Sequence, residues 1–195
     1  MNNRIRWMVT TGALAAIEVV LYILGIFISI GLKAIGLTVT INLSLVPIAV
    51  GALLLGPWCG LFLGFVNGIA VILTPDTIAI FMSQNIFGTI ITCLVKTMAA
   101  GFIAGLLFKL FKDRKFEIVG MIICSLLIPI INTSLFTVGC LLFFKDVLGD
   151  QSPFLFLISL FIGINFIIEI SVSTVLSPAI CKIVKIGRRK QEATS

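Results

Sequence analysis

Long apolar stretches separated by short charged segments run along the whole chain. The longest gap without Asp, Glu, Lys or Arg lies between Lys33 and Asp76 and holds 42 residues. As one helix it would measure about 63 Å, far more than the roughly 30 Å hydrocarbon core of a bilayer. The stretch Val39 to Leu73 is therefore predicted to fold back as a transmembrane helical hairpin. Its turn falls at Gly56-Pro57, because glycine suits the end of one helix and proline the start of the next.

The other apolar runs predict four further spans, at about Trp7 to Ile30, Asn85 to Phe108, Ile118 to Phe144 and Phe154 to Ile180. Apolar residues make up 59% of the chain and charged residues only 11%, whereas a soluble domain carries about 25% charged residues. We therefore expect an all-α polytopic membrane protein with six transmembrane helices. Residues 1–195 are expected to form a single domain, because no linker or second domain is visible.

The lysines and arginines of the loops predict the orientation. With the N-terminus inside, eleven of them fall on the inner side, and only Lys33 and Lys145 fall outside. This asymmetry indicates that the N- and C-termini are cytoplasmic. The net charge of +6 then reflects topology, so a nucleic-acid partner is not expected, although the basic tail can contact anionic lipid.

Residues for metal or enzyme chemistry are missing from the sequence. Histidine does not occur, and the five cysteines are scattered through predicted helices without a C-x-x-C pair. No G-x-x-x-x-G-K-[ST] motif is present, so any ATP hydrolysis must come from a partner. We expect neither an enzyme nor a bound metal or cofactor.

Three ionisable residues, Glu18, Lys96 and Glu169, lie inside predicted spans. Such residues are costly in hydrocarbon and usually face a cavity or a partner. Lys96 has two interpretations: it contacts a ligand, or it forms a structural ion pair with Glu18 halfway through the membrane. Glu169 lies deeper toward the cytoplasm and is interpreted mainly as a structural residue, with ligand contact as the alternative.

Polar side chains also gather on single faces of the later helices. At 100° per residue, Asn85, Thr89, Thr92 and Lys96 fall within about 60° of one another, on a face that leads from the outer end to mid-membrane. Asn132 and Asn165 project from the outer halves of their spans and either contact ligand or join helices by hydrogen bonds. The complete set of candidate ligand contacts is Asn42, Asn67, Gln84, Asn85, Thr89, Lys96, Asn132, Asn165 and Glu169.

Small residues form a patch near the start of the first span. The patch consists of Gly12, Ala13, Ala15 and Ala16, and Glu18 points about 160° away from Ala16 on a helical wheel. The patch either packs inside the protein or serves as a docking face for another membrane protein, because small residues let helices approach closely in lipid.

Several segments resemble the substrate-binding S components of energy-coupling factor (ECF) vitamin transporters. They are LVPIAVGALLLGPWCGLFLGFVNG in the hairpin, GTIITCLVKTMAAGFIAGLLFKL (Gly88 to Leu110), PIINTSLF (Pro129 to Phe136) and NFIIEISVSTVLSPAI (Asn165 to Ile180). The patch is similar to the alanine-rich motif by which that family docks on its coupling subunit, with glycine at the first spaced position.

The resemblance implies a non-catalytic, high-affinity binder in the cell membrane that captures a vitamin or related micronutrient from outside. Its implied partners are a transmembrane T subunit and two ATP-binding A subunits. A carboxylate vitamin such as pantothenate is the first expectation, because Lys96 ends the polar face, and riboflavin is the second. The alternative is a stand-alone secondary transporter of a small organic solute, although no inverted repeat of broken helices is visible.

Overall fold

The computed structural model describes residues 3–34, 42–112, 116–144 and 163–192, and every regular element in these ranges is helical. The predicted all-α fold is thus confirmed. In chain order, the elements are α1 (Asn3–Ala34), α2 (Leu45–Leu55), α3 (Pro57–Ile72), α4 (Pro75–Thr77), the π-helix η1 (Ile78–Met82), α5 (Ile86–Phe111), α6 (Glu117–Phe143) and α9 (Ile164–Glu192).

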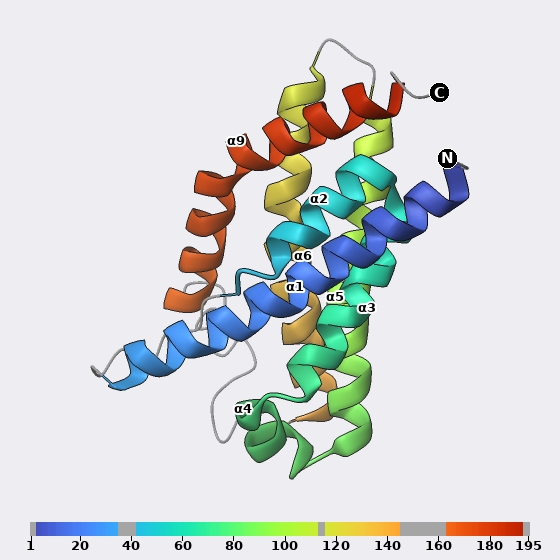
Figure 1. Ribbon diagram of the computed structural model, residues 1–195. Coiled ribbons are helices and arrows are strands. Elements are labelled where there is room, and N and C mark those ends of the chain that lie inside the picture. The colour runs from blue at the N-terminus through green and yellow to red at the C-terminus, as the bar shows by residue number, and fades with distance from the viewer. Residues whose placement is uncertain (1–2, 35–41, 113–115, 145–162, 193–195) are drawn as a thin grey trace.

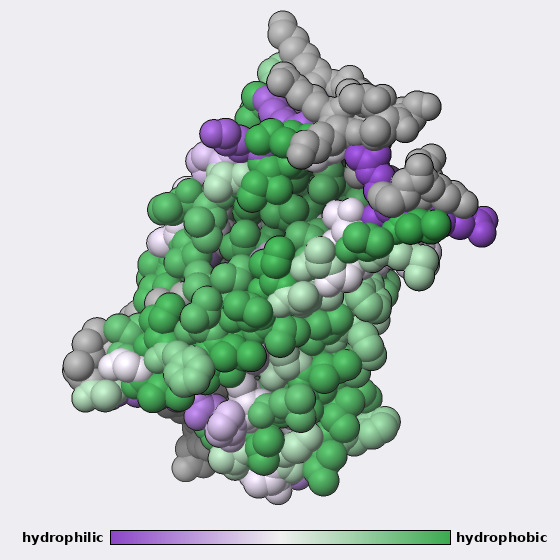
Figure 2. Space-filling view, viewed as in Figure 1, coloured by the Kyte–Doolittle hydropathy of each residue, from purple (hydrophilic) through white to green (hydrophobic). Residues whose placement is uncertain are grey.

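Four helices of the described ranges, α1, α5, α6 and α9, are long and apolar enough to cross a membrane. A fifth candidate is α3 together with α4 and η1, which turn by 68° at a short break. Apolar residues cover most of the visible surface between the two ends of the bundle (Figure 2). The protein is therefore a multi-pass membrane protein, while the count of six spans stays a prediction.

Both termini lie at one end of the bundle, and α4 lies at the opposite end (Figure 1). This arrangement fits the predicted orientation, in which the basic end faces the cytoplasm and α4 faces outward.

Labelling of cysteines tests this orientation. In a variant without the natural cysteines, Asp76→Cys on α4 should react with an impermeant thiol reagent in intact cells. Lys112→Cys, exposed at the end of α5, should react only after the membrane is opened. Reaction of Lys112→Cys in intact cells would reverse the orientation.

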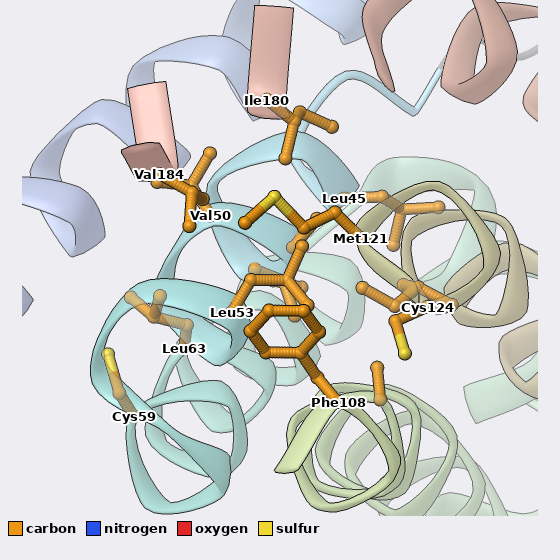
Figure 3. Close-up of a cluster of buried hydrophobic side chains, with 14 of the residues drawn as sticks. Leu45, Val50, Leu53, Cys59, Leu63, Phe108, Met121, Cys124, Ile180 and Val184 are labelled. Carbon is orange, nitrogen blue, oxygen red and sulfur yellow. The ribbon is translucent and has the colours of Figure 1, made fainter. Parts of the chain in front are cut away.

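The short helix α2 is the centre of the fold. It is apolar all round, with the sequence LVPIAVGALLL, and such a helix belongs in a protein interior. It packs against α1, α3, α5, α6 and α9, and most of its side chains are buried. Around it, Phe108 of α5, Met121 and Cys124 of α6, and Ile180 and Val184 of α9 complete one core (Figure 3).

The predicted turn of the hairpin is confirmed at Gly56-Pro57. Gly56 has a φ of 101°, a left-handed conformation that side chains disfavour, and Pro57 is the first residue of α3. The first arm is shorter than predicted, however. Residues 35–41 lie outside the described ranges, Asn42 to Ser44 are not helical, and α2 begins only at Leu45. Its 11 residues span about 17 Å, too little to cross a bilayer alone.

The C-terminal helix also departs from the prediction. The expected span was Phe154 to Ile180, followed by a basic tail. Residues 154–162 lie outside the described ranges, and α9 runs from Ile164 without a break to Glu192. The charges that mark the exit from the membrane do not end a helix, because lysine and arginine are good helix formers. Pro178 lies inside α9, and Figure 1 shows the helix bent along its length, as proline causes.

Glycines bring α3 and α5 into backbone contact. A Cβ atom on Gly101 would collide with the carbonyl of Gly60, and one on Gly64 would collide with the backbone of Thr97. Gly60, Gly64 and Gly68, spaced by four residues along α3, therefore form a packing surface.

We expect Gly101→Ala to destabilise the protein, because the new methyl group has no space against the rigid α3 backbone. Overpacking of this kind costs about 1–3 kcal/mol and occasionally more. Thermal unfolding in detergent measures the loss. Gly31→Ala on α1 is the matched control, since nothing lies within 4 Å of its new Cβ atom. Equal melting temperatures for the two variants would contradict the contact.

Candidate functional site

A cavity of about 540 Å³ lies between α1, α4, η1, α5, α6 and α9. This volume is within the range of about 300–1,000 Å³ that is usual for small-molecule sites. Its polar and charged lining residues are Tyr22, Ser29, Lys33, Asn42, Thr74, Asp76, Thr77, Lys96, Asn132, Thr133 and Glu169. The cavity combines these groups with apolar and aromatic side chains, so it suits an amphiphilic solute.

Lys96 of α5 is a half-buried cation of the cavity wall. Its ammonium nitrogen lies 4.4 Å from the ring centroid of Phe136 on α6, which is a cation–π contact. Glu169 of α9 lines the same cavity, lies next to Thr133 and is in the electrostatic field of Lys96. The two groups do not form a direct ion pair in the described structure, so the ammonium of Lys96 keeps hydrogen-bonding capacity toward the cavity.

Glu18 is not the partner of Lys96. Its carboxyl group is buried between α1 and α3, next to Asn67, and it does not line the cavity. No ion pair joins it to Lys96. Of the two interpretations of Lys96, the structural pair with Glu18 is therefore not the arrangement that the structure shows.

The structure brings four of the nine candidate ligand contacts to the cavity wall: Asn42, Lys96, Asn132 and Glu169. The side chain of Asn165 lies outside the described part of the chain. The amide oxygen of Asn132 is buried and has no hydrogen-bond partner among the described residues, which leaves it available to a ligand or water.

The remaining four candidates do not line the cavity. Asn85 caps α5 by accepting a hydrogen bond from the Gly88 amide at 2.8 Å, and the Thr89 hydroxyl donates to the Asn85 carbonyl at 2.8 Å. Gln84 is exposed, and the Asn67 amide donates to the Ser44 hydroxyl. The polar face of α5 packs mostly on α6, where Gly139 contacts Thr92, so Lys96 alone of its four residues reaches the cavity.

Two features of the cavity were not predicted from the sequence. One is the contribution of α1, whose Tyr22, Ser29 and Lys33 line one wall. Their spacing of seven and four residues places them on one helical face, a signal that the sequence contains. The other is an aromatic cluster in which Phe81 of η1 meets Phe136 and Phe144 edge-on, with ring centroids 5.6 and 5.1 Å apart.

An ion pair joins two elements of the cavity wall. The Lys33 ammonium at the end of α1 lies 2.5 Å from the Asp76 carboxylate on α4. Both side chains are largely exposed, so the pair contributes little to stability, on the order of 0.2–1 kcal/mol.

The small-residue patch on α1 is largely exposed. Gly12, Ala13 and Ala16 are exposed, Ala15 is half-buried, and nothing lies within 4 Å of a Cβ atom built on Gly12. Thr11 and Glu18, by contrast, are buried on the side of α1 that packs against α3. Within the described part of the chain, Ala15 packs against the apolar core, whereas Gly12, Ala13 and Ala16 remain exposed.

A polytopic all-α membrane protein with a solute-sized cavity between its helices belongs to the class of membrane-embedded binding and transport proteins. The family described as "ECF transporter, substrate-specific component" matches residues 6–181, and the chain belongs to this family. It is thus a membrane component of ECF transporters, as the sequence resemblance predicted. No curated protein and no solved structure gave a significant match.

Proposed function

We propose that this protein is the high-affinity vitamin-binding subunit of an ECF-type importer in the cell membrane. The cavity carries this proposal, because it places the Lys96 ammonium against an aromatic side chain among membrane-spanning helices. The protein itself captures the solute without catalysing a reaction. Energy for release comes from two ATP-binding A subunits that act through a transmembrane T subunit.

The first proposed ligand is a vitamin with a carboxylate, such as pantothenate. A carboxylate placed in the cavity accepts charge-assisted hydrogen bonds from the Lys96 ammonium, and Asn42 and Asn132 supply further polar contacts. Riboflavin is the second candidate, supported by Phe81, Phe136 and Phe166, which line the cavity and offer faces for a flat ring.

The proposed docking face for the T subunit is the exposed patch on α1. A partner helix approaches closely only where side chains are small, and Gly12, Ala13 and Ala16 present such a surface to the lipid. The cavity-lining residues of α1 begin at Tyr22, so a partner on the patch leaves the ligand site uncovered.

Purification from the native membrane in mild detergent tests this function. We expect the protein to copurify with one T subunit and an ATPase pair, and mass spectrometry of the denatured sample to release a vitamin in near-equimolar amount. Purification of the protein alone, with a bound organic solute and no ATPase, would instead favour a stand-alone transporter.

A further inference from the structure

The carboxyl group of Glu18 lies buried between α1 and α3 without a visible partner. Only 1% of the residue is exposed, and neither carboxyl oxygen has a hydrogen-bond partner in the structure. Its neighbour Asn67 on α3 is fully buried, and the Asn67 amide oxygen also lacks a partner. Buried polar groups are normally paired, so three unpaired oxygens at one helix contact indicate that a positive species belongs there.

Among the described residues, the groups around Glu18 do not include a cation. On α3 the titratable group that faces it is the Cys59 thiol, whose sulfur lies 3.4 Å from the Thr11 hydroxyl oxygen. On α2, which also packs against α1, every residue from Leu45 to Leu55 is apolar and none is titratable. No lysine or arginine forms an ion pair with Glu18 within the described ranges. The described part of the chain thus supplies no positive side chain to this carboxyl group.

A metal ion fits this place poorly. Hard cations such as Mg²⁺ and Ca²⁺ take six or more oxygen ligands, whereas here only Glu18 and Asn67 contribute free oxygens. No group of three or more metal-binding side chains occurs among the described residues. A proton, by contrast, needs only one carboxyl oxygen and one acceptor.

We propose that Glu18 and Asn67 form a proton-binding site, in which neutral Glu18 donates a hydrogen bond from its carboxyl O–H to the amide oxygen of Asn67. The proton removes the charge of Glu18 and gives the Asn67 oxygen the donor that it lacks. The Asn67 nitrogen stays bound to the Ser44 hydroxyl, which in turn donates to the Asn42 amide oxygen at 2.5 Å. The proton site is thereby the inner end of a polar chain whose outer end, Asn42, lines the cavity.

This site is separate from the proposed ligand contacts, and the inference does not depend on which solute the cavity binds. Its consequence concerns α1, whose main contacts among the described helices are with α2 and α3. Loss of the proton would leave a charge in the contact that holds α1 in place. Attachment of α1 is therefore expected to weaken as the pH rises, because the folded protein holds a proton that the unfolded chain releases.

Infrared spectroscopy tests the proposal directly, since a protonated carboxyl group has a carbonyl stretch that a carboxylate lacks. The experiment uses the full-length Glu169→Gln protein in lipid nanodiscs, so that Glu18 is the remaining acidic side chain away from the ends of α1, α5, α6 and α9. We expect one protonated-carboxyl band that persists from mildly acidic to mildly alkaline pH. The double variant Glu18→Gln/Glu169→Gln should lose this band, because glutamine keeps the shape of the side chain without the carboxyl group.

Asn67→Leu in the Glu169→Gln protein supplies the second measurement. The band should move to higher frequency, because the carboxyl group loses its hydrogen-bond acceptor, and an unmoved band would overturn the assignment to Asn67. Absence of the band from the Glu169→Gln protein at neutral pH would overturn the proton site itself. Replacing choline by sodium in the buffer should leave the melting temperature unchanged. A higher melting temperature in sodium that Glu18→Gln abolishes would assign a metal cation to the site instead of a proton.

Discussion

Replacing Gly12 and Ala16 together by leucine is expected to abolish assembly with the T subunit. Both positions are exposed on α1, and a Cβ atom on Gly12 meets nothing in the protein, so the larger side chains fit the isolated subunit. In a complex they would hold the partner helix several ångströms away, which removes the close packing on which association in lipid depends. Copurification of the tagged double variant with T and A subunits measures the effect.

Binding of the ligand by the isolated double variant should stay at the wild-type level, because the patch does not line the cavity. Val20→Ala is a matched control on another exposed part of α1, and it should assemble normally. Wild-type yields of the complex with the double leucine variant would show that the patch is not the docking face.

Lys96→Ala is expected to weaken ligand binding strongly, if the ligand carries an anionic group as proposed. The variant removes the cation in a poorly hydrated site and leaves the anion of the ligand without a partner. Losing one member of a buried charge pair costs about 2–5 kcal/mol, which corresponds to roughly 30-fold to several-thousand-fold in Kd. Titration calorimetry with the solute that copurifies with the protein gives this ratio.

Lys33→Ala is the matched control for Lys96→Ala. It removes the other lysine of the cavity wall, but Lys33 is 40% exposed and paired with Asp76, so its effect should be only a few-fold. Adding Glu18→Gln to Lys96→Ala should not restore binding, because the two side chains are not paired in the structure. Unchanged binding by Lys96→Ala would remove the argument for a carboxylate vitamin.

Much of the fold could be predicted from hydrophobic periodicity and turn chemistry. The hairpin turn at Gly56-Pro57 was predicted, and the bounds of α5 and α6 lie within three residues of the prediction. The late start of α2 was not predicted, because the run before it contains no charged residue. In the structure the Ser44 hydroxyl donates to the Asn42 amide oxygen, and these residues do not continue the helix. Nor does hydropathy show that α9 stays helical beyond the membrane.

The cavity was predictable only in part, and the reason lies in tertiary packing. A helical wheel groups Thr89 and Thr92 with Lys96, but it does not say which neighbouring helix covers that face. In the structure α6 covers the N-terminal part of this face of α5, through Gly139 and Phe143. Of the predicted polar residues of the face, only Lys96 remains at the cavity. The same limit applies to Glu18, whose position halfway through its span suggested a pairing that the direction of its side chain prevents.

The shape of α1 has a mechanical consequence. This helix of 32 residues carries the small-residue patch in one half and cavity-lining residues in the other. Between Gly12 and Ser29 it acts as a stiff rod of about 26 Å, at 1.5 Å per residue. A tilt of about 10° around one end would carry the other by between 4 and 5 Å, roughly the pitch of one helical turn. A subunit that binds the patch and tilts α1 would therefore displace the cavity-lining residues of this helix without contacting the solute.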